Sequence, residues 1–338
     1  MKKATMTKEF CNFVGIDVSK NTLDVCVIAD NANTHQQYSN DEQGIKKMLS
    51  DVKQRKGSGI CNTLFCFEHT GVYGRKLALT LTKKQCSVWI VMPVAILRSI
   101  GLQRGKNDKV DARRIASYAM KHHQEAHLWE QPRKEVETLR QLLGTRERML
   151  NSLNSLRTPI NELKQTGNKD LAAVILQASK TAIKGLEKGI AQIDRQMDAV
   201  IAKDAALSTL YELITSIPGI GKITATELIC FTNEFKLYKE AKQLACYCGV
   251  APFEHSSGSS VRGKTRVSHM ANKSLKCKLH LCAMSAIQYD TELKTYYQRK
   301  VAEGKNKMLV INAVRNKLVH RITAVVKRQT PFKYKNAA

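Results

Sequence analysis

Acidic residues are scarce in the C-terminal third of the sequence, where only Asp290, Glu292 and Glu303 follow His255. Residues 221–338 contain 22 basic and 7 acidic side chains, and the whole chain of 338 residues has a net charge of +26. A surface with one sign of charge repels itself unless a polyanion neutralises it. The composition therefore indicates a nucleic acid partner, since each Lys or Arg that meets a phosphate releases counterions. A membrane surface is the weaker alternative, because no basic amphipathic anchor is evident.

Long apolar runs are missing as well. The most apolar stretch, residues 88–97, is about half as long as a membrane span and contains Pro93. The N-terminus, MKKATMTKEFCN, is basic but lacks the apolar segment of a signal peptide. These absences predict a cytoplasmic chain that is neither exported nor inserted into a membrane.

Metal-type cysteine spacing is also absent. The 10 cysteines form no CxxC pair and no Cys/His set with zinc spacing. We expect them to be small buried residues in a reducing cytoplasm. Hydrophobic residues make up 43% of the chain, enough for a substantial core, and the length predicts two or three domains.

The first predicted domain, residues 9–128, has an α/β pattern. Apolar runs predict strands over residues 13–18, 23–29, 63–67 and 87–92, with a weaker strand over 35–38. Helices are predicted over residues 41–53, 73–83 and 108–122. Three strands followed by alternating helices and strands indicate a mixed sheet with helices on both faces.

The second predicted domain, residues 129–212, has a helical pattern. Its second half shows the 3-4 spacing of a coiled-coil seam, at Ile183, Leu186, Ile190, Ile193, Met197 and Val200. A preceding helix over about residues 133–164 has a similar register, and residues 167–168 are the expected turn. We expect an antiparallel coiled-coil hairpin that acts as a spacer or a dimerisation element.

The third predicted domain, residues 213–338, is basic and mostly helical. It begins with IPGIGK, a pattern typical of a helix-hairpin-helix that binds a phosphate through Gly219, Gly221 and Lys222. The alternative is an ordinary turn between two helices. Further nucleic-acid contacts are predicted at Arg262, Lys264, Arg266, Lys273 and Lys276.

Four carboxylates form the sharpest chemical signal. Asp17 interrupts the first apolar strand, where an unpaired charge is costly, and Glu68 follows the strand over residues 63–67. Asp108 and Asp111 share one face of a predicted helix. Such acids can hold two Mg²⁺ ions, which stabilise the attacking and leaving oxygens in phosphoryl transfer. The alternative for the helical pair is a cap and a solvated acid, which leaves Asp17 and Glu68 unexplained.

A Ser/Gly-rich loop over residues 249–260 precedes the basic cluster. Taken alone, such a loop is a flexible connector. A serine hydroxyl becomes a good nucleophile only when a base or a metal ion activates it. His255 is either such a base or another phosphate contact.

Five motifs, in this order along the chain, resemble those of a known family. The segments GIDVSK, FEHTGVYG, NDKVDARRIA, IPGIGKITATEL and YCGVAPFEHSSGSSVRGKTRVSHMANKSLK closely resemble the DEDD transposases of the IS110 family, over about residues 12–327. The resemblance implies a RuvC-like N-terminal domain with a ribonuclease H-type fold, a coiled coil and a C-terminal transposase domain. It also implies that Asp17, Glu68, Asp108 and Asp111 are the Mg²⁺ ligands.

The same resemblance implies a nucleophile and partners. The family's serine stands before the glycine of an SG motif, which makes it Ser257, with Ser256 as the adjacent rival. Double-stranded donor and target DNA, a structured bridge RNA and a dimer or tetramer of the chain are the implied partners. The chain departs from the family's ISKxGN pattern at residues 267–272, where His269 and Ala271 stand in place of Lys and Gly.

Together these features predict a recombinase. The serine attacks DNA, and a hydroxyl of the partner strand then resolves the covalent link without ATP. One alternative is a Holliday-junction endonuclease that uses the same acids with water. Another is an actin-like sugar kinase, because GIDVSK resembles a phosphate loop, but the net charge of +26 counts against it.

Overall fold

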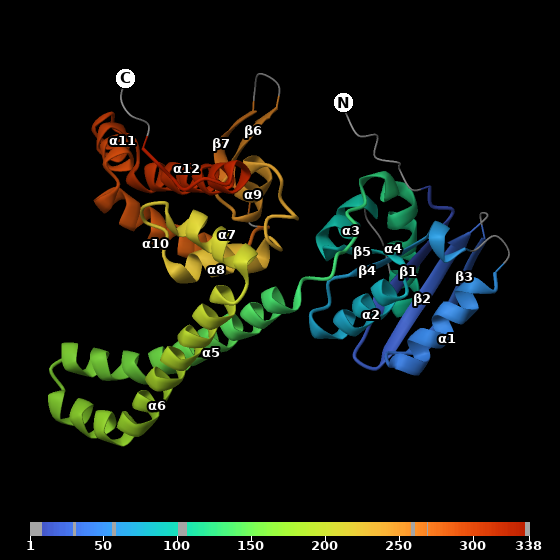
Figure 1. Cartoon of the computed structure of the whole chain (residues 1–338), viewed down its shortest axis with the longest axis horizontal. Helices are drawn as coiled ribbons and strands as arrows, with labels where there is room; N and C mark the ends of the chain where they lie inside the picture. The colour runs from blue at the N-terminus through green and yellow to red at the C-terminus, as the bar shows by residue number, and fades with distance from the viewer. Residues whose placement is uncertain are drawn as a thin grey trace. The chain divides into compact units, whose positions relative to one another are not determined.

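A computed structural model describes residues 9–29, 32–55, 59–100, 107–257, 261–268 and 270–334. The chain forms two compact units, Met1–Gln131 and Pro132–Ala338 (Figure 1). Each unit has its own hydrophobic core, so each is described by itself. None of the helices in the described ranges is long and apolar enough to cross a membrane.

The first unit is built on a mixed sheet, as the sequence predicts. Its strands are β1 (Asn12–Val18), β2 (Thr22–Ala29), β3 (Ala32–Ser39), β4 (Thr63–Glu68) and β5 (Ser87–Val91). They lie in the order β3-β2-β1-β4-β5. Strand β2 is antiparallel to both β1 and β3, whereas β4 and β5 run parallel to β1. The third strand is longer than predicted, because pairing with β2 supports a polar sequence that has little strand signal of its own.

Helices cover both faces of this sheet because side chains alternate along β1. Val14 and Ile16 pack into one cluster with α1 and α2, whereas Phe13 packs into another with α4. The helical segments are α1 (Glu42–Lys53), η1 (Ile60–Asn62), α2 (Val72–Lys83), α3 (Pro93–Ile100), α4 (Asp108–His122) and η2 (His123–Glu125). The predicted helices are present, and α3 is an addition that the sequence reading missed.

The second unit is mostly helical. Its elements are α5 (Lys134–Gln165), α6 (Lys169–Ala202), α7 (Ala205–Thr215), α8 (Lys222–Phe231), α9 (Ala241–Tyr247), β6 (Pro252–Ser257), β7 (Val261–Val267), α10 (Lys273–Tyr289), α11 (Thr291–Ala302) and α12 (Lys307–Arg328). One core joins the helices of this unit, and it includes Leu139 of α5 and Met197 of α6. The base of the α5–α6 hairpin is therefore part of the core that holds the C-terminal helices.

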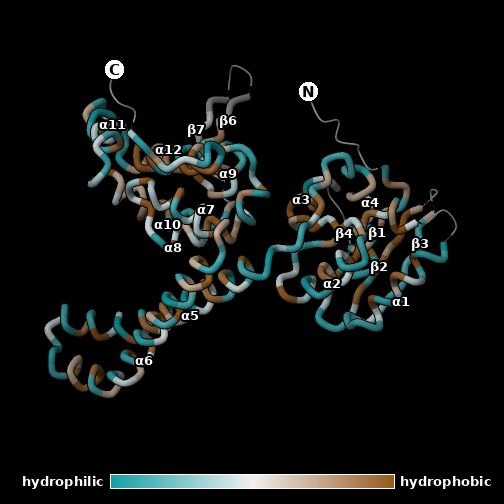
Figure 2. Tube along the Cα trace, viewed as in Figure 1, coloured by the Kyte–Doolittle hydropathy of each residue, from teal (hydrophilic) through white to brown (hydrophobic). Residues whose placement is uncertain are grey.

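The hairpin of α5 and α6 turns at Thr166–Asn168, where Gly167 has a positive φ of 86°. Away from the base, a separate apolar cluster holds the helices together, with Leu153, Ile160 and Ile183 buried. Ion pairs also cross between the helices, from Arg146 to Asp194 at 2.6 Å and from Arg157 to Glu187. Hydrophobic and hydrophilic residues alternate along both helices (Figure 2), as expected for two amphipathic helices packed side by side.

The Ser/Gly-rich segment differs from the predicted loop. Residues up to Ser257 belong to β6, which pairs with β7 in an antiparallel ribbon that has an irregularity between Phe253 and His255. The alternation of β7, Val-Arg-Gly-Lys-Thr-Arg-Val, is weak because most of its side chains are polar. The strand character therefore comes from cross-strand pairing rather than from an apolar pattern.

Candidate active site

Two of the predicted acids end neighbouring parallel strands. Asp17 lies near the carboxyl end of β1, and Glu68 is the last residue of β4. The parallel register pairs Ile16 with Phe67, so the two acids follow at the next position of each strand. Ile16 and Phe67 share the cluster on the α1 and α2 side, which directs Asp17 and Glu68 to the opposite face.

Helix α4 covers that opposite face. Gly15 of β1 allows the close approach, because a Cβ atom there would lie less than 3.0 Å from backbone atoms of Ala112 and Ala116. Cys26 of β2 packs against the same two alanines. The contact fixes α4 against the strand that carries Asp17.

The other two acids lie in the first turn of α4. Asn107 caps this helix, and its side-chain oxygen accepts a hydrogen bond from the backbone N–H of Val110 at 2.8 Å. Asp108 and Asp111 follow in the first turn, where carboxylates suit the helix dipole. Asp111 accepts a hydrogen bond from Arg114 at 2.7 Å. The turn thus holds both acids at a defined place on the α4 side of the sheet.

Electrostatics link the strand acid to the helix acids. The pKa of Asp17 is raised, first by burial and then by the negative charges of Asp108, Asp111 and Asp24. When partly buried carboxylates lie near one another, their repulsion favours either protonation of one of them or binding of a cation. The sequence prediction that Asp17, Asp108 and Asp111 share one region is consistent with this interaction.

Asp24 is an acid that the sequence reading did not single out. It pairs directly with Asp17 across the antiparallel β1–β2 ladder. Asp24 is 5% exposed, and it accepts hydrogen bonds from His35 Nε2 at 2.9 Å and Gln37 Nε2 at 3.0 Å. The only sequence signal was one acid inside the apolar run LDVCVIA, and its relation to Asp17 depends on strand pairing.

The donor set suits a hard cation such as Mg²⁺, because all four predicted ligands are carboxylates. Within the described ranges, no three His, Cys, Asp or Glu side chains lie close enough together to hold an ion. Asp111 is engaged by Arg114 on its own helix. Joint coordination would therefore require the carboxylates to move toward one another.

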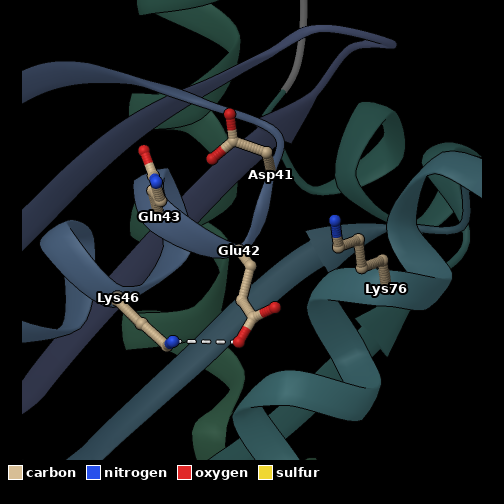
Figure 3. A pocket seen from close by; sticks show the side chains of 5 residues that line it. All are labelled: Asp41, Glu42, Gln43, Lys46 and Lys76. Atoms are coloured by element: carbon tan, nitrogen blue, oxygen red, sulfur yellow. Dashed lines mark ion pairs between the residues drawn. The ribbon is translucent and has the colours of Figure 1, made fainter.

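A surface hollow in this unit lies apart from the acids, at the start of α1 and beside α2. Its volume is about 540 Å³ and it is lined by Asp41, Glu42, Gln43, Lys46 and Lys76 (Figure 3). Asp41 caps α1 and accepts from the N–H of Gly44 at 2.7 Å, and Glu42 pairs with Lys46 at 2.9 Å. The helix cap and the ion pair account for these groups without a ligand.

The candidate serines lie in the second unit. Ser256 and Ser257 end β6, where the register pairs them with Arg262 and Val261. The side chains of His255, Ser256, Ser257, Arg262 and Lys264 lie outside the described part of the structure, as do residues 258–260 and His269 altogether. The structure therefore gives the backbone register of the predicted nucleophile and of two predicted cations.

Comparisons with known proteins identify the family. A pilin gene-inverting protein of Moraxella bovis is 31% identical over 327 residues, which cover 95% of this chain and 97% of that protein. Residues 14–166 match the model of a transposase family, DEDD_Tnp_IS110, and residues 211–298 match that of the transposase IS116/IS110/IS902 family. The chain belongs to the IS110 family of DEDD transposases.

Partial matches agree with that assignment. An uncharacterised 43.6 kDa protein of insertion element IS110 from Streptomyces coelicolor is 32% identical over 141 residues, 41% of this chain and 33% of that protein. A probable family 20 transposase from Pseudomonas aeruginosa is 25% identical over 166 residues, 47% of this chain and 46% of that protein. The four acids and the Ser/Gly-rich segment fall within the two matched segments of this transposase.

The IPGIGK segment of the transposase forms the turn between α7 and α8. Gly219 has a φ of +90°, and a Cβ atom there would lie 2.8 Å from the carbonyl oxygen of Cys282 on α10. Gly221 caps α8 and leaves open space at its Cβ position. Lys222 pairs with Asp198 of α6 at 3.2 Å. Close packing on α10 therefore explains Gly219, and any phosphate at Lys222 would compete with Asp198.

Three other predicted cations of the transposase have described side chains, one on β7 and two on α10. Arg266 is exposed on β7, opposite Phe253. Lys273 and Lys276 lie in the first turns of α10, which Asn272 caps by accepting from the N–H of Leu275 at 3.0 Å. Among the side chains that the structure describes, these three cations have no ion-pair partner.

Proposed function

We propose that this protein is an insertion-sequence recombinase that cuts and rejoins DNA through a serine-linked intermediate under the direction of a bridge RNA. Family membership supports an enzyme acting on DNA. The observation that carries the proposal is that Asp17, Glu68 and helix α4, whose first turn carries Asp108 and Asp111, lie on the same face of one sheet.

The N-terminal unit is proposed to be a RuvC-like, ribonuclease H-type domain. The sheet order β3-β2-β1-β4-β5 and the helices on both faces support it. We also propose the division into 9–128, 129–212 and 213–338, with the α5–α6 hairpin as an antiparallel coiled coil. The ion pairs that join α5 to α6 and the separate apolar cluster between these helices support the coiled coil.

Asp17, Glu68, Asp108 and Asp111 are proposed to hold Mg²⁺, as two ions per site. Bound there, Mg²⁺ would polarise the scissile phosphate and lower the pKa of the attacking hydroxyl. The raised pKa of Asp17, due to burial and to neighbouring carboxylates, supports a place where a cation is favoured. Release of Asp111 from Arg114 would accompany this binding.

Ser257 is proposed as the nucleophile, with Ser256 as the adjacent candidate. As Ser257 Oγ bonds to phosphorus it gives up its proton, the bond from phosphorus to the 3′ oxygen breaks, and the 3′ oxygen takes up a proton. The DNA is then joined to the protein through a 5′ phosphoserine. In the second step the 3′ hydroxyl of the partner strand attacks this phosphorus, and the serine recovers its proton. One phosphodiester is exchanged for another, so no ATP is needed.

The basic C-terminal unit is proposed to hold RNA and DNA through their backbones, while base pairing reads the sequence. The 22 basic against 7 acidic side chains over residues 221–338 support this role. A dimer or tetramer is the proposed assembly, with the hairpin as its contact. The pilin gene-inverting relative favours rejoining over hydrolysis, because its name describes inversion of DNA.

The experiment is a cleavage assay with the full-length protein, the RNA transcribed from DNA flanking its gene, and DNA carrying the element ends. We expect Asp17→Asn and Glu68→Gln to reduce Mg²⁺-dependent strand cleavage by about 100-fold or more, while gel-shift affinity changes little. Glu125→Gln, at an exposed acid of the same unit, is the matched control and should cleave normally. Full cleavage in EDTA would contradict the metal role, and hydrolysed nicks without exchange would indicate the endonuclease.

A further inference from the structure

Arg315 is a buried cation in the middle of α12. It is 7% exposed, and its neighbours Val314 and Leu318 are fully buried. Its Nη2 donates a hydrogen bond to Nδ1 of His280 on α10 at 3.0 Å. Its Nε is buried and has no hydrogen-bond partner. Among the described side chains, the guanidinium thus has one hydrogen-bond partner, which is neutral, and one N–H donor without an acceptor.

Other arginines of the same unit have carboxylate partners, which Arg315 lacks among the described side chains. Carboxylates pair with arginines that are less buried than Arg315, namely Arg133, Arg146, Arg157 and Arg321. Among the side chains that the structure describes, no carboxylate pairs with Arg315. A buried charge without a counter-charge is costly, and burial lowers the pKa of this guanidinium.

The hydrogen bond also defines the state of His280. Because Nδ1 accepts from the guanidinium, that nitrogen carries no proton, and the neutral ring has its proton on Nε2. Burial and the charge of Arg315 both lower the pKa of His280, which agrees with a neutral ring. His280 is partly exposed, so it offers an N–H donor backed by a buried positive charge.

This pair lies close to the base of the serine-bearing ribbon. Asn312, one turn before Arg315 on α12, donates to the carbonyl oxygen of Val250 at 3.0 Å, two residues before β6 begins. Lys276, one turn before His280, has its Nζ 3.8 Å from the Cβ position of Gly249. Among the described side chains, the neighbours that these contacts identify are an amide, an ammonium group and, beside Arg315, the thiol of Cys277, and none of them is a carboxylate.

We propose that Arg315 and His280 form an anion site that binds a backbone phosphate of the nucleic acid at the base of the β6–β7 ribbon. His280 donates through Nε2–H, and Arg315 fixes that tautomer and supplies the charge. This inference rests on the proposed function for its ligand. It assigns a phosphate contact to His280 and a positioning role to Arg315, two residues that the sequence motifs leave without a role.

The first test measures the thermal unfolding midpoint of the full-length protein with inorganic phosphate and with chloride at equal ionic strength. Phosphate should raise the wild-type midpoint more than chloride does, and Arg315→Met and His280→Leu should lose that increment. Without phosphate, Arg315→Met should be at least as stable as wild type, because it removes an uncompensated charge. A purely structural arginine predicts the opposite, a lower midpoint with the phosphate increment kept. The control is His320→Gln, at an exposed histidine of α12.

The second test measures affinity for duplex DNA over a range of salt concentrations. His280→Leu and Arg315→Met should each weaken binding about tenfold and make the slope of log K against log salt shallower by about one. Salt slopes that stay unchanged in both variants would overturn the site. An equal rise of the wild-type unfolding midpoint with phosphate and with chloride would overturn it as well. If both variants keep the rise in midpoint that phosphate causes, the phosphate is an adventitious ion only. Wild-type protein that binds phosphate at this site yet fails to cleave DNA would refute the proposed function and leave the anion site standing.

Discussion

At the scale of single residues, the acid site depends on partners that are far apart in the sequence. Asp17 could be singled out from the sequence as a candidate because it interrupts an apolar strand, and Asp108 and Asp111 because their spacing places them on one helix face. Asp24 could not, because its importance follows from the β1–β2 register and from hydrogen bonds donated by His35 and Gln37. Local spacing carries no information about such pairing.

Arg133 provides a pH prediction at this scale. It donates to Asp204 at 2.6 Å and to Glu234 at 2.6 Å, and its hydrogen bonds lower the pKa of Asp204. Burial acts to raise the pKa of Glu234, but Arg133 and Lys236 together outweigh burial and the net shift is downward. Lowered carboxyl pKa values stabilise the fold above the ordinary values of 3.8 and 4.5, and that stabilisation is lost as the pH falls through the lower folded values.

We therefore expect Arg133→Met to reduce the free energy of unfolding by about 1–3 kcal/mol at pH 7, and by less at pH 3. Urea unfolding of the full-length protein at both pH values measures the difference. Arg157→Met is the matched control, because Arg157 and Glu187 are both 46% exposed, and it should cost under about 1 kcal/mol. A loss of equal size at both pH values would contradict the linkage.

At the scale of elements, segments with strong periodicity were predictable. The strands at β1, β2, β4 and β5 and the helix α4 lie where apolar runs and caps place them. Helix α3 was missed because Pro93 breaks an apolar run, although proline is well suited to the first turn of a helix. Strands β6 and β7 were missed because cross-strand pairing, not an apolar pattern, forms them.

The packing of α4 on β1 gives the second prediction. Gly15→Ala adds a Cβ atom that would meet the backbone of Ala112 and Ala116, so α4 must move away from the sheet. We expect a loss of about 1–3 kcal/mol in the free energy of unfolding and a large loss of cleavage, since α4 carries Asp108 and Asp111. Gly185→Ala in α6, where a Cβ atom meets nothing within 4 Å, should be neutral or stabilising. Normal cleavage by Gly15→Ala would show that this packing does not position the acids.

At the scale of the whole molecule, composition predicted the class of partner, and the ordered motifs predicted the family. The surplus of basic residues lies over residues 221–338, whereas the four acids lie in the first unit. The sequence could not reveal that the base of the hairpin shares its core with the C-terminal helices, because that core is assembled from segments far apart in the chain.

The uneven charge gives the third prediction. We expect Arg262→Gln, Lys264→Gln and Arg266→Gln combined to weaken nucleic-acid binding and to make the slope of log K against log salt shallower by about two to three. The control combines Lys184→Gln, Lys188→Gln and Arg195→Gln, which remove the same charge from exposed positions of the hairpin helix α6. If both triple variants change the slope equally, total charge rather than the ribbon determines binding.

The most direct test of the central claim is peptide mapping by mass spectrometry of the covalent adduct between the full-length protein and a nicked DNA substrate that traps it. We expect a phosphodiester link to Ser257 that forms when Mg²⁺ and the bridge RNA are present and that does not form in Ser257→Ala or in Asp17→Asn. No adduct with wild-type protein that still exchanges strands, or an adduct at a residue outside 256–257, would contradict it.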